Sequence, residues 1–172
     1  MNRPIINIAD LDYQGFPGGI PDHARERFDG ARIGQAGRAL GARKLGYNVT
    51  VVPPGKRAFP FHCHRINEEM FFVIEGSGEI RIGGAVHAIR AGDVIACPPG
   101  GPESAHQIVN TSADTELRYL AVSTRITPEI CEYPDSGKFG VAAEFDPDAD
   151  GKPQMFYHLG RPGDSLGYWD GE

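Results

Sequence analysis

The sequence predicts an all-β protein, a sandwich or barrel of many short strands. Its twenty-three glycines and fourteen prolines stand in clusters between runs of valine, isoleucine, phenylalanine and threonine, which is typical of strands joined by tight turns. Helical periodicity is missing from residues 47–124. About eight strands are expected, and that number favours two sheets that close, or nearly close, around one core.

The central strand is expected at 69–75, where EMFFVIE is rich in aromatic and β-branched residues. Alternation divides its side chains between two faces, Glu69, Phe71 and Val73 on one and Met70, Phe72 and Ile74 on the other. Since an open apolar face would be sticky, an arm of the chain or a second subunit should cover the second set. The other strands are expected in 47–52, 78–84, 85–93, 94–101, 104–112 and 116–125, with 78–101 spaced like an antiparallel meander.

A chain of 172 residues is the size of one domain, and we expect a barrel with two arms. The N-terminal arm is placed at 1–36, the barrel at 37–126 and the C-terminal arm at 127–172. Residues 22–28 predict one or two helical turns, with Asp22 as the N-cap. The C-terminal arm has little periodicity, so we expect it to gain order by packing on the barrel.

Charge and cysteine content restrict the partners and the compartment. A net charge of -6 gives no electrostatic reason to bind nucleic acid or an anionic membrane. No export signal is visible in the first twenty residues, and no apolar run is long enough to span a membrane. Cys63, Cys97 and Cys131 are odd in number and form no CxxC pair, so we expect buried, unpaired thiols and a cytoplasmic protein.

A metal site is suggested by the stretch HCHRINEEMFFVIEG at 62–76. His62 and His64 are two residues apart, so on an extended chain they point to one face and Cys63 points to the other. Imidazole nitrogen with the carboxylate oxygen of a nearby glutamate suits zinc, iron, nickel or manganese. A third histidine is therefore expected from elsewhere in the chain.

The same stretch resembles the first motif of the cupin superfamily, which is a glycine, HxH, three or four residues, a glutamate, six residues and a glycine. In this sequence the matching residues are Gly55, His62, His64, Glu69 and Gly76. One extra residue separates the first glycine from the first histidine. Glu68 competes with its neighbour, but the six-residue gap before the last glycine selects Glu69.

The second cupin motif, G(x)5PxG(x)2H(x)3N, is similar to residues 92–110. The matching residues are Gly92, Pro98, Gly100, His106 and Asn110, with five residues in place of two before the histidine. The resemblance implies a jelly-roll β-barrel, also called a double-stranded β-helix, that is usually a homodimer. It further implies one divalent metal ion (Mn, Fe, Zn or Ni) held by His62, His64, Glu69 and His106. The alternative for these four residues is a hydrogen-bonded polar cluster in a barrel without metal.

Three functions stay open on the sequence. The C-terminal YPDSGK and YWDGE segments are similar to those of bacterial single-domain cupins described as sugar phosphate isomerases or regulators, which favours a metal-dependent isomerase with the metal as Lewis acid. An iron-dependent dioxygenase and a non-catalytic ligand-binding or sensor protein are the alternatives. An anionic small-molecule substrate could contact Arg43, Lys44, Arg125 or Lys138, although such residues are more often solvated. Tyr168 and Trp169 could cover a pocket, and no general base is indicated.

Overall fold

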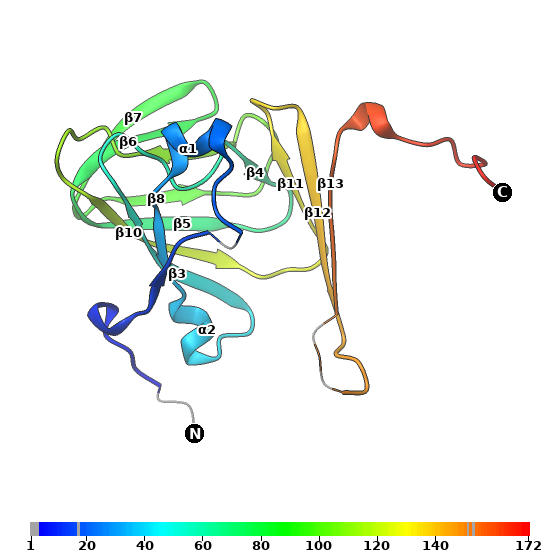
Figure 1. The fold of residues 1–172 in the computed structure, drawn as a ribbon, viewed down its shortest axis with the longest axis horizontal. Coiled ribbons are helices and arrows are strands. Elements are labelled where there is room, and N and C mark those ends of the chain that lie inside the picture. The colour runs from blue at the N-terminus through cyan, green and yellow to red at the C-terminus, as the bar shows by residue number, and fades with distance from the viewer. Residues whose placement is uncertain (1–3, 17, 151, 153) are drawn as a thin grey trace.

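The computed structural model describes residues 4–16, 18–150, 152 and 154–172, and most of its regular structure is antiparallel β-strand (Figure 1). This confirms the predicted all-β class. The largest sheet has the strand order β1-β2-β3-β10-β5-β8. Its members are β1 (Tyr13–Gln14), β2 (Arg32–Gly34), β3 (Leu45–Val52), β10 (Leu117–Thr124), β5 (Glu69–Glu75) and β8 (Val94–Cys97).

Two smaller sheets complete the molecule. One has the order β7-β6-β9 and is formed by β6 (Ser77–Ile82), β7 (Ala85–Arg90) and β9 (His106–Val109). The other has the order β13-β12-β11-β4 and is formed by β4 (Cys63–His64), β11 (Glu129–Tyr133), β12 (Lys138–Phe145) and β13 (Gln154–Gly160). Single bridges from Arg57 to Val109 and from His62 to His106 place the segment before β4 along the open edge of β9.

The core lies between the large sheet and the β7-β6-β9 sheet. Phe71 and Tyr119 come from the large sheet and meet edge to face, with ring centroids 5.7 Å apart. Ile80 and Ile108 come from the facing sheet and belong to the same buried cluster. Side chains of both sheets therefore fill one interior, as in a jelly roll.

The expected meander over 78–101 is wrong in its second half. β6 pairs with β7, but β8 crosses over and pairs with β5 in the large sheet. Ile89 and Ile95 thereby face the same core from opposite sheets. The short turn at 91–93 is compatible with either connection, so spacing alone could not distinguish them.

The N-terminal segment covers part of the outer face of β5, as expected. Leu11, Ala36 and Val49 form a second buried cluster against which Ile74 packs. Phe72, in the middle of the strand, stays 37 % exposed.

Helices in this segment differ in detail from the prediction. Helix α1 (Asp22–Phe28) begins at Asp22, whose carboxylate does not cap it but pairs with Arg25 at 3.0 Å. Helix α2 (Ala36–Leu40) was not predicted, and it ends at Gly41, which has a positive φ of 75°. The short 3-10 turns η1 (Ile8–Asp10) and η2 (Pro162–Asp164) lie near the two ends. Among the described residues no helix has the length and apolar character needed to cross a bilayer.

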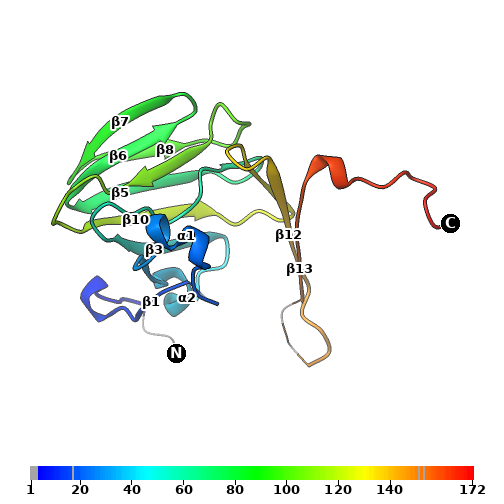
Figure 2. The same cartoon turned by 45° about the horizontal axis from the view of Figure 1, so that its top comes forward.

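Beyond residue 127 the chain forms three strands that the sequence did not predict. β11 pairs with β4 beside the barrel, whereas β12 and β13 form a ribbon that runs away from it and leads to the C-terminus (Figures 1 and 2). β13 reads QMFYHLG, so apolar side chains stand on both of its faces and no alternation of polar and apolar residues marks it as a strand. Residues 154–159 are all exposed. The boundaries between arms and barrel remain a prediction.

Asn110, the last residue of the second motif, generates a test of the fold. It is fully buried and its amide donates to the carbonyls of Val52 and Thr115, at 2.9 and 2.8 Å. Asn110→Ala should reduce the free energy of unfolding by about 3 kcal/mol, because two buried carbonyls lose their donor. Thr111→Ala, at the exposed next position, should change it by less than about 0.5 kcal/mol. Urea denaturation checks both, and equal effects would contradict the role of Asn110.

Candidate metal centre

Three strands and one isolated bridge bring the motif residues to one end of the barrel. His64 lies on β4, Glu69 is the first residue of β5 and His106 is the first residue of β9. His62 faces His106 across a bridge in which each backbone N–H donates to the other's carbonyl, at 3.2 and 2.8 Å. Since Glu69 belongs to the large sheet, the site spans the opening between the two sheets.

The three imidazoles converge on one carboxylate oxygen. The Nε2 atoms of His106, His64 and His62 lie 2.9, 3.3 and 3.8 Å from Oε2 of Glu69. Their rings are at most 18 % exposed. The structure thus brings together all four residues that the motifs indicate, while their role as metal ligands remains a prediction.

His62 presents an unprotonated Nε2 to the site. Its Nδ1 lies 2.8 Å from the carbonyl oxygen of Pro60, which can only accept, so Nδ1 carries the proton. Burial, together with the nearby His106, lowers the pKa of His62 to about 4. The ring is therefore neutral at pH 7, which is the state that binds a metal ion.

His64 lies beside both Glu69 and Cys131. Burial lowers its pKa, but contacts with Cys131 and Glu69 outweigh burial and raise it to about 10. For the carboxylate of Glu69 burial acts in the opposite direction and raises the pKa. Contacts with His106 and His64 outweigh burial and hold the pKa of Glu69 well below its usual range. Cys131, expected to be a small buried hydrophobe, instead places its Sγ 3.3 Å from Nδ1 of His64. This contact orients the ring so that Nε2 points into the site.

Glu129, which the motifs do not include, fixes the loop between His64 and Glu69. Its side chain is buried and accepts backbone N–H groups of Arg65, Ile66 and Asn67 at 3.1, 3.3 and 2.8 Å. The Asn67 amide also donates to it and, at 2.9 Å, to the carbonyl of Ile126. Glu129 lies 3.7 Å from Nδ1 of His64, but its oxygens are already occupied by these donors. We therefore assign it to orienting the loop rather than to binding a metal.

The donor set fits a divalent cation. His64 Nε2 is a buried nitrogen without a hydrogen-bond partner, because its neighbour Glu69 is not in line to accept from it. His62, His64 and Glu69 also present one ligand atom each within 4.8 Å of one another. Three imidazole nitrogens and one carboxylate oxygen suit zinc, iron, manganese or nickel.

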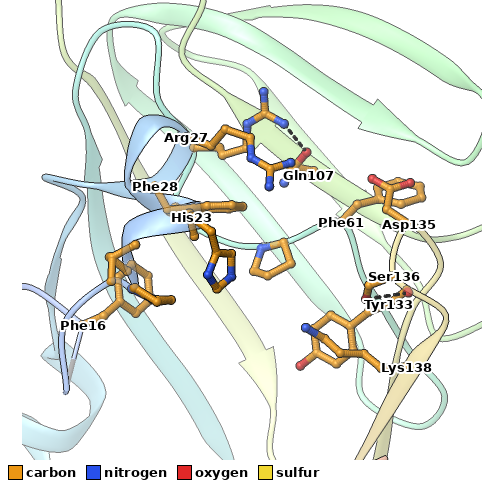
Figure 3. Close-up of a pocket in the computed structure, with 16 residues that line it drawn as sticks. Phe16, His23, Arg27, Phe28, Phe61, Gln107, Tyr133, Asp135, Ser136 and Lys138 are labelled. Atoms are coloured by element: carbon orange, nitrogen blue, oxygen red, sulfur yellow. Dashed lines mark hydrogen bonds between the residues drawn. The ribbon is translucent and has the colours of Figure 1, made fainter. Parts of the chain in front are cut away.

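Figure 3 shows a cavity of about 480 Å³, which is lined by Phe61 and Gln107, the chain neighbours of His62 and His106, but by none of the four candidate ligands. Tyr133 lines it and also stacks on His62, with ring centroids 6.1 Å apart. Lys138 is the one residue of the four suggested anion contacts that lies on this cavity. Tyr168 and Trp169 are 86 % and 77 % exposed and do not cover it.

Comparison with known proteins identifies the class. Residues 48–123 match the family model of the cupin domain, which confirms the resemblance of the two motifs. The part of the chain from β3 to β10 is therefore a cupin domain. No curated protein matches the chain.

Solved structures agree with this fold. A cupin-superfamily sugar phosphate isomerase from Silicibacter pomeroyi is 24% identical, with a TM-score of 0.76, over 97% of this chain and 98% of that one. A predicted oxalate decarboxylase from Thermotoga maritima is 21% identical, with a TM-score of 0.57, over 71% and 99%. The polyketide cyclase RemF from Streptomyces resistomycificus is 21% identical, with a TM-score of 0.56, over 75% and 83%. At these identities the likeness establishes the jelly-roll fold.

Adjacent glutamates provide a matched test of the site. Glu69→Gln should weaken Zn²⁺ binding by more than about 100-fold, because it removes the only carboxylate in the donor set, and even orienting partners are worth about 10- to 100-fold. Glu68→Gln makes the same chemical change on an exposed side chain and should leave affinity within about twofold. Competitive titration against a chromogenic chelator measures both. Equal affinities for the two variants would remove Glu69 from the ligand set.

Proposed function

We propose that this cupin is a metal-dependent enzyme that acts on a small molecule, and specifically an isomerase of a sugar phosphate. The observation that carries the proposal is the convergence of three imidazole Nε2 atoms on Glu69 beside a cavity large enough for a monosaccharide derivative. The similarity to the Silicibacter pomeroyi protein motivates the choice of substrate.

In this proposal His62, His64, Glu69 and His106 hold one Mn, Fe, Zn or Ni ion. When bound, such an ion supplies Lewis acidity that polarises a substrate carbonyl or hydroxyl oxygen. The hydrogen bonds of His62 to Pro60 and of His64 to Cys131 leave the Nε2 atom of each ring directed into the site. A preset donor geometry reduces the reorganisation that binding requires.

Tyr133 is the best placed proton donor of the cavity wall. Burial raises the pKa of its hydroxyl, which therefore stays protonated at neutral pH. Its ring is held between His62 and the ammonium of Lys138, which lies 5.0 Å from the ring centroid. The hydroxyl can donate to a substrate oxygen but cannot act as a base.

The test is elemental analysis of protein purified without a nickel column, followed by an NMR assay of aldose and ketose phosphate interconversion. We expect near-stoichiometric metal and interconversion that Glu69→Gln abolishes and Glu68→Gln retains. Oxygen uptake that requires iron would replace isomerisation by the dioxygenase alternative. Protein that neither contains nor takes up metal would contradict both enzymes and leave a ligand-binding or sensor barrel.

We also propose a homodimer in the cytoplasm. Unpaired Cys63, Cys97 and Cys131 suit a reducing compartment. Met155, Tyr157 and Leu159 are 65%, 61% and 46% exposed on one face of β13, an apolar area that a stable chain would cover. We expect a second copy of the chain to cover this area. The two-stranded ribbon of β12 and β13 is barely stable alone and can pack against the same ribbon of a symmetry-related copy.

Light scattering tests the assembly. We expect twice the chain mass of 18.6 kDa for the protein and the mass of one chain for the double variant Met155→Glu, Tyr157→Glu. Val86→Glu, an exposed apolar position on β7, is the control and should remain dimeric. A protein of one chain mass, or a dimer unaffected by the double variant, would exclude this interface.

A further inference from the structure

The cavity beside the candidate metal centre is enclosed by two parts of the chain that are distant in sequence. Figure 3 shows His23, Arg27 and Phe28 of α1 on one side and Tyr133, Ser136 and Lys138 of the β11–β12 hairpin on the other. Pro60, whose carbonyl accepts a hydrogen bond from Nδ1 of His62, and Gln107, which follows His106, also line it. The cavity thus borders the candidate metal centre through these residues and Tyr133, and not through the four candidate ligands themselves.

The cavity carries uncompensated positive charge. Arg27, Arg57 and Lys138 line it, and in the part of the chain that the structure describes none of them lies within 4.0 Å of a carboxylate. Its one acidic residue, Asp135, is neutralised from outside, because Arg81 places Nη1 3.0 Å from both carboxylate oxygens. Three excess cations around one cavity are unexpected in a chain whose net charge is -6.

The two arginines are fixed next to each other by the backbone. The N–H of Arg57 donates to the carbonyl of Arg27 at 2.9 Å, which ties α1 to the barrel wall. The Arg57 guanidinium makes one long contact, 3.4 Å from Nη1 to Oε1 of Gln107, and its Nε is buried without a partner. Burial, and then repulsion from Arg27, lowers the pKa of Arg57. Such a group is stabilised by an oxyanion, which would both pair its charge and accept from its free donors.

We propose that this cavity binds the phosphoryl group of a phosphate monoester, with Arg27, Arg57 and Lys138 as its contacts. A phosphate dianion matches three excess cations better than a carboxylate monoanion does, and its three oxygens can accept from two guanidinium forks and an ammonium together. The cavity volume of about 480 Å³ suits a small molecule rather than a peptide or a nucleic acid.

The position of the cavity defines how such a ligand would lie. With its phosphate between α1 and Lys138, the remainder extends past Tyr133 towards His62 and the other imidazoles. The assignment of the reacting end rests on the proposed function, whereas the anion site itself does not. Phosphate binding energy at a distance from the reacting atoms would then serve to orient them.

The test is calorimetric titration with inorganic phosphate at constant ionic strength. Arg57→Gln and Arg27→Gln should each weaken phosphate binding by about tenfold or more, since each removes a charged donor. Arg25→Gln makes the same change on the same helix, on a side chain that lies outside the cavity, and should alter affinity by less than about twofold. Acetate should bind at least about tenfold more weakly than phosphate. Arg27 is exposed and its backbone bond to Arg57 survives the substitution, so this variant remains informative if Arg57→Gln unfolds.

Glu69→Gln separates this cavity from the metal centre. Phosphate binding that persists in Glu69→Gln and fails in the arginine variants supports the proposal, even if the protein proves to contain no metal and the proposed function fails. Binding that is lost in Glu69→Gln and unchanged in both arginine variants places phosphate on the metal and overturns the proposal. Absence of phosphate binding by the unsubstituted protein overturns it as well.

Discussion

The arrangement of the candidate metal centre depends on one buried carboxylate, Glu129, whose hydrogen bonds all go to groups of its own chain. A carboxylate in the interior is costly unless it is fully hydrogen-bonded, and Glu129 meets that condition only when the backbone of 65–67 turns its N–H groups towards it. This turn fixes the path of the chain from His64 to Glu69. It therefore also fixes the distance between the imidazoles of the HxH pair and the carboxylate of Glu69. Glu129 lies on β11, which pairs with β4, the strand of His64. The chain beyond residue 127 therefore helps to hold the site in place.

Much of the site could be predicted because it is encoded by local spacing. The HxH pair needs only an extended backbone to point both rings one way, and the strand at 69–75 shows its pattern plainly. His106, 37 residues after Glu69, was predicted from its resemblance to the second motif. In the structure a β-bridge to His62 places it beside the first motif. Glu129, Asn67 and Cys131 could not be found in this way, since their roles arise from contacts across the fold that leave no periodic signal.

The elements of the fold that the sequence did not predict correctly were missed for similar physical reasons. Alternation reports which side of a strand is buried, but β7 and β8 both bury one side against the same core, so the crossing between sheets is invisible to it. β13 has apolar side chains on both faces and was not recognised as a strand for that reason. Helix α2 is only five residues long and contains a glycine, where propensity gives little guidance.

The two halves of the cavity suggest why the chain needs segments outside the barrel. A jelly roll with three imidazoles at one end is suited to a cation, but of the three basic residues on the cavity only Arg57 belongs to the barrel. Arg27 comes from α1 and Lys138 from β12, and each is positioned by one contact, Arg27 by its backbone bond to Arg57 of the barrel wall and Lys138 by the ring of Tyr133. Added elements therefore place positive charge beside a preset cation site without altering the strands that form it, and a ligand with an oxyanion at one end and hydroxyl or carbonyl oxygens at the other is what such a combination would select.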